Sequence, residues 1–227
     1  MSCQIAIDGP AGAGKSTAAR RAAEALGFLY VDTGAMYRAI ALHMLRRGLE
    51  PEDEETVSAA CREADVTLRY EGGVQQIYLN GENVSAQIRE EEVSNAASVI
   101  SGYPAVREKL LGLQRRIAEE NNVIMDGRDI GTSILPDAGL KIYLTASVHT
   151  RALRRYRELK EKGTECDLAA VERDITERDY RDMHRGIAPL RQAPDAVLVD
   201  SSQLGIGEVA ELICAHARRV YRIDTEV

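Results

Sequence analysis

The stretch IAIDGPAGAGKST, residues 5–17, begins as an apolar run and ends in glycines, a lysine and two hydroxyl residues. Its second part matches the pattern G-x-x-x-x-G-K-[ST] between an expected strand and an expected helix, the context in which the pattern has a mechanism. Glycines let successive backbone N–H groups turn inward as an anion-binding nest, and the helix adds its positive N-terminal end. The expected ATP-binding residues are Gly9, Pro10, Ala11, Gly12, Ala13, Gly14, Lys15, Ser16 and Thr17.

Within this phosphate loop, the lysine and the first hydroxyl residue have separate expected roles. Lys15 would reach the β- and γ-phosphates, and Ser16 would ligate Mg²⁺ bound with ATP. Asp126, at the end of the apolar run NVIMD, is placed to help hold the magnesium through water. The competing interpretation is a glycine-rich turn that caps a helix and leaves its lysine exposed.

Composition restricts the class of protein. The chain has 227 residues, 44% hydrophobic and 29% charged, as is ordinary for one soluble globular domain. The formal charge of −7 argues against nucleic acid or an anionic membrane as the partner. The four cysteines lack metal-site or disulfide spacing, and no targeting segment or long apolar span is evident. We expect a cytoplasmic protein, and any anionic ligand must meet a local cluster of arginines.

Five short apolar runs predict the strands of an α/β fold: CQIAID, FLYVD, NVIMD, LKIYLT and DAVLVD. Their continuous hydrophobicity is typical of a parallel sheet covered by helices on both faces. Segments with apolar residues at helical spacing alternate with these runs, at 18–26, 37–45, 106–117 and 209–220.

One region interrupts the alternation. The sequence VTLRYEGGVQQIYLNGENV, residues 66–84, holds alternating runs separated by Gly-Gly and Asn-Gly, which are strong hairpin signals. We expect a small antiparallel sheet there, followed by a helix that Ser85 would cap. The predicted organisation is one domain, 1–227, with an inserted subdomain at 62–100.

The phosphate loop alone does not separate a kinase from a GTPase switch or a motor ATPase. The chain has no N-K-x-D segment of guanine readers and no L-S-G-G-Q segment of transporter ATPases. At 227 residues it also has little room for a motor's second domain. A small phosphotransferase is the leading hypothesis, and a nucleotide-binding regulator without transferase activity is the alternative from another class.

The segment VDTGAMYR follows the second predicted strand. It places the hydroxyl of Thr33 and the guanidinium of Arg38 near the carboxyl end of that strand, where ligands bind in open α/β sheets. The competing interpretation makes Thr33 a helix N-cap and Arg38 a solvated helix residue. Both interpretations can hold, because a capping threonine can also face a ligand.

Two further segments are rich in charge. In VIMDGRDIGTSILPDA, Arg128 and Asp129 project from the loop beyond the third strand, or form an ordinary surface ion pair. In ERDITERDYRDMHRGIAPLR, residues 172–191, helical spacing predicts a shared face for Arg178, Arg181 and Arg185. The alternative is a solvated helix laced by ion pairs. Phosphoryl transfer favours the first interpretation, because several cations must neutralise the transferring oxygens. A second cluster consists of Arg151, Arg154 and Arg155.

Taken together, IAIDGPAGAGKST, DTGAMYRA, VSNAASVISGYPAVRE, DGRDIGT, KIYLTAS and ERDYRDMHRGIAPL resemble bacterial cytidylate kinases, in the right order from residue 5 to about 200. The resemblance implies a P-loop nucleoside monophosphate kinase fold, with a five-stranded parallel sheet, a small antiparallel insert that binds the monophosphate, and a lid at 151–190. It implies a monomer that phosphorylates CMP and dCMP with ATP. The runner-up within kinases is another small-acceptor enzyme, such as an adenylate or shikimate kinase.

The resemblance also assigns roles to single residues. By position, Thr33, Ser98, Arg107 and Asp129 match residues that recognise cytosine, Arg38, Arg128 and Arg185 match those around the monophosphate, and Arg178 with Asp182 match those near the sugar. The expected catalytic cations are Lys15, Arg128, Arg178 and Arg185. A carboxylate such as Asp129 can accept from the exocyclic amine of cytosine, whereas uracil presents a carbonyl there.

Overall fold

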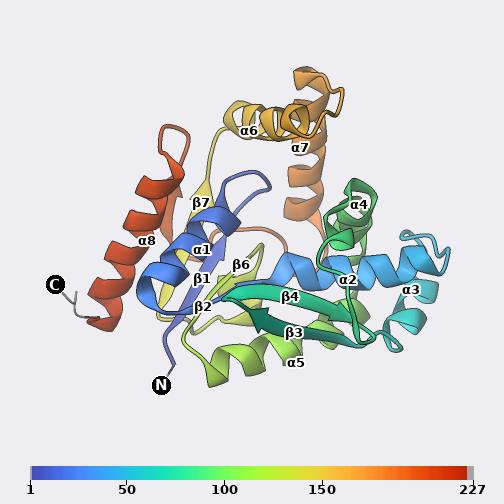
Figure 1. Cartoon of the computed structure of the whole chain (residues 1–227), viewed down its shortest axis with the longest axis horizontal. Helices are drawn as coiled ribbons and strands as arrows, with labels where there is room; N and C mark the ends of the chain where they lie inside the picture. Colours follow the sequence, from blue (N-terminus) through green and yellow to red (C-terminus); the bar gives the residue numbers. More distant parts are fainter. Residues whose placement is uncertain (1, 224–227) are drawn as a thin grey trace. The chain divides into compact units, whose positions relative to one another are not determined.

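A computed structural model describes residues 2–223 of the chain. Two compact units are distinguished: one holds the described residues up to Tyr30 and from Asn121 onward, and the other is Val31–Glu120. Figure 1 shows the elements along the chain. The second unit includes the 62–100 insert expected from the sequence.

The central sheet has five strands in the order β2-β6-β1-β7-β8. The strands are β1 (Gln4–Asp8), β2 (Leu29–Asp32), β6 (Val123–Gly127), β7 (Leu140–Thr145) and β8 (Val197–Asp200). Strand β1 pairs in parallel with both β6 and β7, and β7 pairs in parallel with β8. Each predicted apolar run forms one of these strands, so the predicted fold class is confirmed.

In the first unit, helices α1 (Lys15–Leu26) and α8 (Ile206–Tyr221) pack with the sheet around one core. This core joins alanines of α1 to the apolar side chains of β1, β7 and α8. The small alanine side chains let α1 lie close to the sheet, and this packing fixes the N-terminal end of α1 against the end of β1. A short helix, η2 (Ile130–Ile134), follows β6.

Helices α6 (Val148–Glu161) and α7 (Leu168–His184) of the first unit pack on each other through a separate small core. Ala152, Val171 and Ile175 are the buried members of this core. The predicted shared face of three arginines is wrong in part, because α7 ends at His184 and Arg185 lies beyond it. Arg181 is exposed, whereas Asp182 is buried.

The second unit contains helices and a small sheet. Its helices are α2 (Thr33–Arg46), α3 (Glu54–Cys61), η1 (Gln87–Arg89), α4 (Glu91–Ile100) and α5 (Pro104–Glu120). The strands β3 (Val66–Glu71), β4 (Val74–Leu79) and β5 (Glu82–Asn83) form an antiparallel sheet in that order. The two turns have positive φ at both central residues, as tight hairpins require. The predicted hairpins are therefore confirmed.

Neither of the two helix caps considered from the sequence is observed: the competing interpretation of Thr33 as an N-cap does not hold, and the predicted cap at Ser85 is wrong. The cap of α2 is Asp32, whose carboxylate accepts from the Ala35 N–H at 2.9 Å, and Thr33 is the first helical residue. Ser85 does not cap a helix, because its hydroxyl accepts from the Ile77 N–H at 2.9 Å within the sheet region.

No helix among residues 2–223 is long and apolar enough to cross a bilayer.

Candidate active site

The phosphate loop lies between β1 and α1, where the sequence predicted it. Gly9 has φ 148°, and a Cβ atom there would lie 1.9 Å from the carbonyl oxygen of Leu144. Gly14 is left-handed, with φ 88°, at the position before α1 begins. Side chains at these positions would strain the backbone or collide with β7, so the loop requires glycine.

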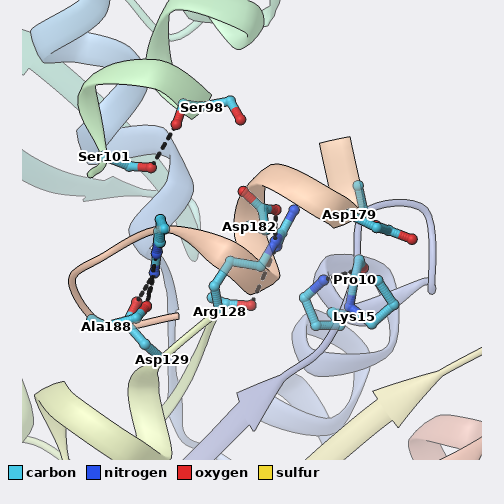
Figure 2. A network of polar contacts seen from close by, with 12 residues as sticks. Pro10, Lys15, Ser98, Ser101, Arg128, Asp129, Asp179, Asp182 and Ala188 are labelled. Atoms are coloured by element: carbon cyan, nitrogen blue, oxygen red, sulfur yellow. Dashed lines mark hydrogen bonds and ion pairs between the residues drawn. The ribbon is translucent and has the colours of Figure 1, made fainter. Parts of the chain in front are cut away.

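Lys15 is folded into the loop that precedes it. The side chain is buried, and its Nζ donates to the Pro10 carbonyl at 2.8 Å (Figure 2). Burial, aided by the nearby charge of Arg128, lowers the pKa of Lys15 to about 7. An anionic ligand would favour the charged ammonium, so the position suits a cation that meets phosphate.

Ser16 and Asp126, the two residues expected to hold magnesium, contact each other. The Ser16 hydroxyl donates to Asp126 Oδ2 at 2.7 Å, and the hydroxyl of Tyr30 donates to Asp126 Oδ1 at 3.0 Å. Hydroxyl and carboxylate oxygens are the donors that Mg²⁺ prefers. No group of three or more potential metal-binding side chains occurs among the described residues. The pair thus fits an ion whose remaining ligands are water and nucleotide phosphates rather than a protein cage.

Asp8, at the end of β1, holds the loop that follows β6. Its carboxylate accepts from the backbone N–H groups of Ile130 and Gly131, each at 2.8 Å. Burial raises the pKa of Asp8 to about 6, against the lowering effect of these two hydrogen bonds. Because Asp129 immediately precedes the two amides, Asp8 fixes the backbone beside a predicted base-reading residue.

Arg128 and Asp182 form an ion pair between the loop after β6 and helix α7. Arg128 Nε donates to Asp182 Oδ2 at 2.9 Å, with side-chain exposures of 21% and 5% (Figure 2). Burial alone would raise the pKa of Asp182, but the charges of Arg128 and Arg178 hold it below the ordinary range. Burial likewise opposes the charge of Arg128, and Asp182 keeps the pKa of Arg128 above its usual range.

A second ion pair joins the same loop to the segment after α7. Arg185 Nη2 donates to Asp129 Oδ1 at 3.0 Å, and the side chains are only 10% and 5% exposed. Arg185 Nε also donates to the Ala188 carbonyl at 2.7 Å. The short distance and the burial fix both charged groups in orientation, which a solvated surface pair would not do.

Two arginines of α6 contact the phosphate loop itself. Arg151 donates to the Ala11 carbonyl at 3.0 Å and pairs with Asp179 of α7 at 2.6 Å. Arg154 Nη1 lies 3.4 Å from the Ala13 carbonyl, and its Nη2 donates to the Ser201 carbonyl at 2.7 Å. The sequence grouped these arginines as a cluster but did not predict that they support the loop.

In the second unit, Arg38 is oriented by Asp32. Arg38 Nη2 donates to Asp32 Oδ2 at 2.8 Å, and Asp32 also caps α2. The Gln75 side chain of β4 makes two hydrogen bonds to the Asp32 backbone. It accepts from the Asp32 N–H at 2.9 Å and donates to the Asp32 carbonyl at 3.3 Å. Among the described residues, the buried Arg38 Nε has no hydrogen-bond partner. Arg38 thus keeps a spare donor. Thr33, at the start of the same helix, is 2% exposed.

Ser98 and Arg107, the other predicted residues of the second unit, lie around the turn after α4. Ser101 donates to the Ser98 carbonyl at 2.9 Å (Figure 2). Arg107 donates to the Ser101 carbonyl at 3.2 Å. The Arg107 guanidinium also lies 5.9 Å from the centre of the Tyr37 ring. The buried Ser98 hydroxyl oxygen has no partner in the described part of the chain.

The predicted residues are divided between the two units. The first-unit cluster consists of the phosphate loop, Lys15, Ser16, Asp126, Arg128, Asp129, Arg178, Asp182 and Arg185, and the second-unit cluster of Thr33, Arg38, Ser98 and Arg107. Sequence reasoning missed Asp8, Tyr30 and Gln75. Asp8 carried the same signal as Asp126, an acidic residue that ends an apolar strand, whereas no pattern distinguishes Tyr30 or Gln75 from packing and surface residues.

A glycine-rich phosphate loop between the first strand and first helix of a parallel sheet defines a P-loop nucleotide-binding protein. A family profile described as cytidylate kinase matches residues 5–219. A cytidylate kinase of Desulfitobacterium hafniense is 50% identical over 92% of this chain and 90% of the relative. One from Caldanaerobacter subterraneus is 49% identical over 96% of both chains. The chain belongs to the cytidylate kinase family.

A solved structure supports the fold independently of close sequence similarity. An uncharacterized protein from Eubacterium ventriosum superposes with a TM-score of 0.53 at 11% identity, covering 95% of this chain and 98% of that one. At that identity, the similarity concerns the fold alone.

Proposed function

We propose that this protein transfers the γ-phosphoryl group of ATP to CMP and dCMP, producing ADP with CDP or dCDP. An oxygen of the acceptor phosphate attacks the γ-phosphorus, and the bond from that phosphorus to the β,γ-bridging oxygen breaks. Membership of the cytidylate kinase family supports the substrate class. The single structural observation that carries the proposal is the first-unit cluster, in which the phosphate loop, a Ser–Asp pair and two buried Arg–Asp pairs lie in one unit.

The proposed catalysis consists of positioning and neutralisation of charge. Because the acceptor is already a phosphate anion, no general base is needed, and the predicted need is for cations around the transferring oxygens. Lys15, Arg128, Arg178 and Arg185 are proposed for this task. The ion pairs with Asp182 and Asp129 hold two of the guanidinium groups in fixed orientations before a nucleotide binds.

Magnesium is proposed to bind with ATP, held by Ser16 directly and by Asp126 through water. When bound, it would screen the phosphate oxygens and favour the departure of ADP. The Ser16–Asp126 contact at 2.7 Å supports this assignment.

Cytosine recognition is proposed for Thr33, Ser98, Arg107 and Asp129, monophosphate binding for Arg38, Arg128 and Arg185, and sugar binding for Arg178 and Asp182. Arg38 Nε and Ser98 Oγ are buried and have no hydrogen-bond partner within residues 2–223, which suits groups that bind a polar ligand. Asp129 supplies a carboxylate whose orientation is fixed by Arg185.

We further propose that residues 62–100 act as the monophosphate-binding insert and 151–190 as the lid. The α6–α7 pair supports the lid assignment, because it has a small core of its own. A monomeric, cytoplasmic enzyme without a nucleic-acid partner is proposed, in keeping with the free cysteines at 3, 61, 166 and 214 and the net charge of −7.

The test is ADP production by the purified protein with Mg²⁺ and ATP, with CMP, dCMP, UMP, AMP or shikimate offered separately. The proposal predicts strong turnover with CMP and dCMP. Turnover with AMP or shikimate instead would replace it by another small-acceptor kinase. ATP binding without turnover of any acceptor would replace it by a nucleotide-binding regulator.

A further inference from the structure

Tyr30 contacts the proposed magnesium site but has no role in the mechanism above. It lies in β2, with 7% of the residue exposed, and its hydroxyl donates to Asp126 Oδ1 at 3.0 Å. The Arg20 guanidinium lies 5.3 Å from the centre of its ring. The ring is thus held in place while its only polar atom reaches the carboxylate at the end of β6.

The two oxygens of Asp126 have different donors. Oδ1 accepts from Tyr30 at 3.0 Å, and Oδ2 accepts from Ser16 at 2.7 Å. A serine hydroxyl has one proton and two lone pairs. Because the proton of Ser16 is committed to Asp126, its lone pairs are the part of the hydroxyl that remains to face a cation.

We infer that Tyr30 is a positioning residue for magnesium binding. It fixes the rotation of the Asp126 carboxylate, so that Oδ2 takes the proton of Ser16 and Ser16 presents its lone pairs to the ion. The inference rests on the proposed function of Ser16 and Asp126.

The charges around Asp126 explain why such an anchor is needed. The charge of Lys15 interacts with that of Asp126. The hydrogen bond from the Tyr30 hydroxyl to Oδ1, at 3.0 Å, opposes rotation of the carboxylate toward this ammonium group, and its loss favours that rotation. Ser16 then loses its acceptor, and its proton is no longer directed away from the metal.

The test compares Tyr30→Phe with the wild-type protein by calorimetry of ATP binding, once with Mg²⁺ and once with EDTA. Tyr221→Phe is the matched control, because the Tyr221 hydroxyl also lies in the first unit and accepts from the Gln4 N–H at 3.1 Å. The affinity in EDTA is expected to stay within about twofold in all three proteins. The factor by which Mg²⁺ increases the affinity for ATP is expected to be about tenfold smaller in Tyr30→Phe and unchanged in Tyr221→Phe. A tenfold loss corresponds to the loss of one hydrogen bond to a charged group. Undiminished tightening in Tyr30→Phe overturns the inference.

A double-mutant cycle identifies the route of the effect. If Tyr30 acts through Asp126, Tyr30→Phe changes the magnesium effect in the wild-type background but not in Asp126→Asn. An equal change in both backgrounds contradicts the inference. That outcome is also the one expected if Tyr30→Phe only destabilises the fold. The binding measurement needs no acceptor. An absence of CMP turnover would therefore contradict the proposed function without affecting the test of Tyr30.

Discussion

The first-unit and second-unit clusters differ in how their polar side chains are held. In the first unit, charged side chains are paired with carboxylates, as in Arg128–Asp182 at 2.9 Å and Arg185–Asp129 at 3.0 Å. In the second unit, Arg107 is directed by a backbone carbonyl, and Ser98 has a buried hydroxyl with no partner among residues 2–223. Arg38 there is paired with the carboxylate of Asp32 at 2.8 Å.

This difference matches the charge of the ligand proposed for each cluster. Phosphates carry concentrated negative charge. In the ligand-free protein, the buried cations proposed to bind them must be paired with carboxylates. A base offers neutral donors and acceptors, for which hydroxyls and peptide groups suffice. The comparison therefore predicts large losses of rate from the first cluster and smaller losses of affinity from the second.

The largest effect is expected for Lys15→Met. Loss of the cation at the transferring phosphate should lower kcat by about 10³-fold. The same change should raise the melting temperature of the ligand-free protein, because burial lowers the pKa of Lys15 to about 7 and the charged ammonium is costly there. Steady-state kinetics and thermal unfolding check both parts. A kcat equal to that of the wild type would contradict the larger role of the first-unit cluster in the reaction rate. A lower melting temperature would contradict the cost of burying the charged Lys15 ammonium.

A smaller effect, on stability, is expected from Asp8. Its pKa in the folded protein is about 6, above the ordinary 3.8. The stabilisation from its protonated form is fully present below pH 3.8 and is lost as the pH rises through 6. The unfolding free energy of the wild type, relative to Asp8→Asn, should fall by roughly 2 kcal/mol between pH 4 and pH 8. Denaturant titrations at each pH measure it, and a pH-independent difference would show that the Asp8 carboxyl carries no burial cost.

The smallest effect is expected from Gln75→Leu in the second unit. Gln75 holds the Asp32 backbone through two hydrogen bonds, and Asp32 orients Arg38. The KM for CMP should rise by about tenfold with kcat and the KM for ATP little changed. Gln76→Leu is the control, because the Gln76 side chain accepts from the exposed Asn83 at 3.3 Å and not from the Asp32 backbone. Equal effects of the two substitutions would contradict the positioning of Arg38 by Gln75.

The sequence predicted most of the fold because its signals are local. Each strand is a continuous apolar run, and the turns at Gly72-Gly73 and Asn80-Gly81 require positive φ. The phosphate loop was predictable for the same reason, since its mechanism depends on consecutive residues. Asp8 could have been predicted as a site residue in the same way, because it is an acidic residue at the end of an apolar strand.

The contacts between distant segments were not predictable. The Tyr30–Asp126 hydrogen bond joins residues 96 positions apart, and the Gln75–Asp32 bonds join residues 43 positions apart. Helical spacing placed Arg185 on the face of α7, but the helix ends at His184 and Arg185 turns to Asp129. Such partners depend on strand order and on where helices end, which hydrophobic periodicity does not specify.

The central claim, a kinase that reads cytosine with the Asp129 carboxylate, is tested most directly by the ratio of kcat/KM for CMP to that for UMP. The ratio is measured in the wild type, in Asp129→Asn and in the control Asp137→Asn, whose aspartate is exposed. The amide can donate to the uracil carbonyl, so the ratio should be about 10²-fold lower in Asp129→Asn and unchanged in the control. A ratio that stays at the wild-type value in Asp129→Asn would contradict it, even if both rates fall through loss of the pair with Arg185.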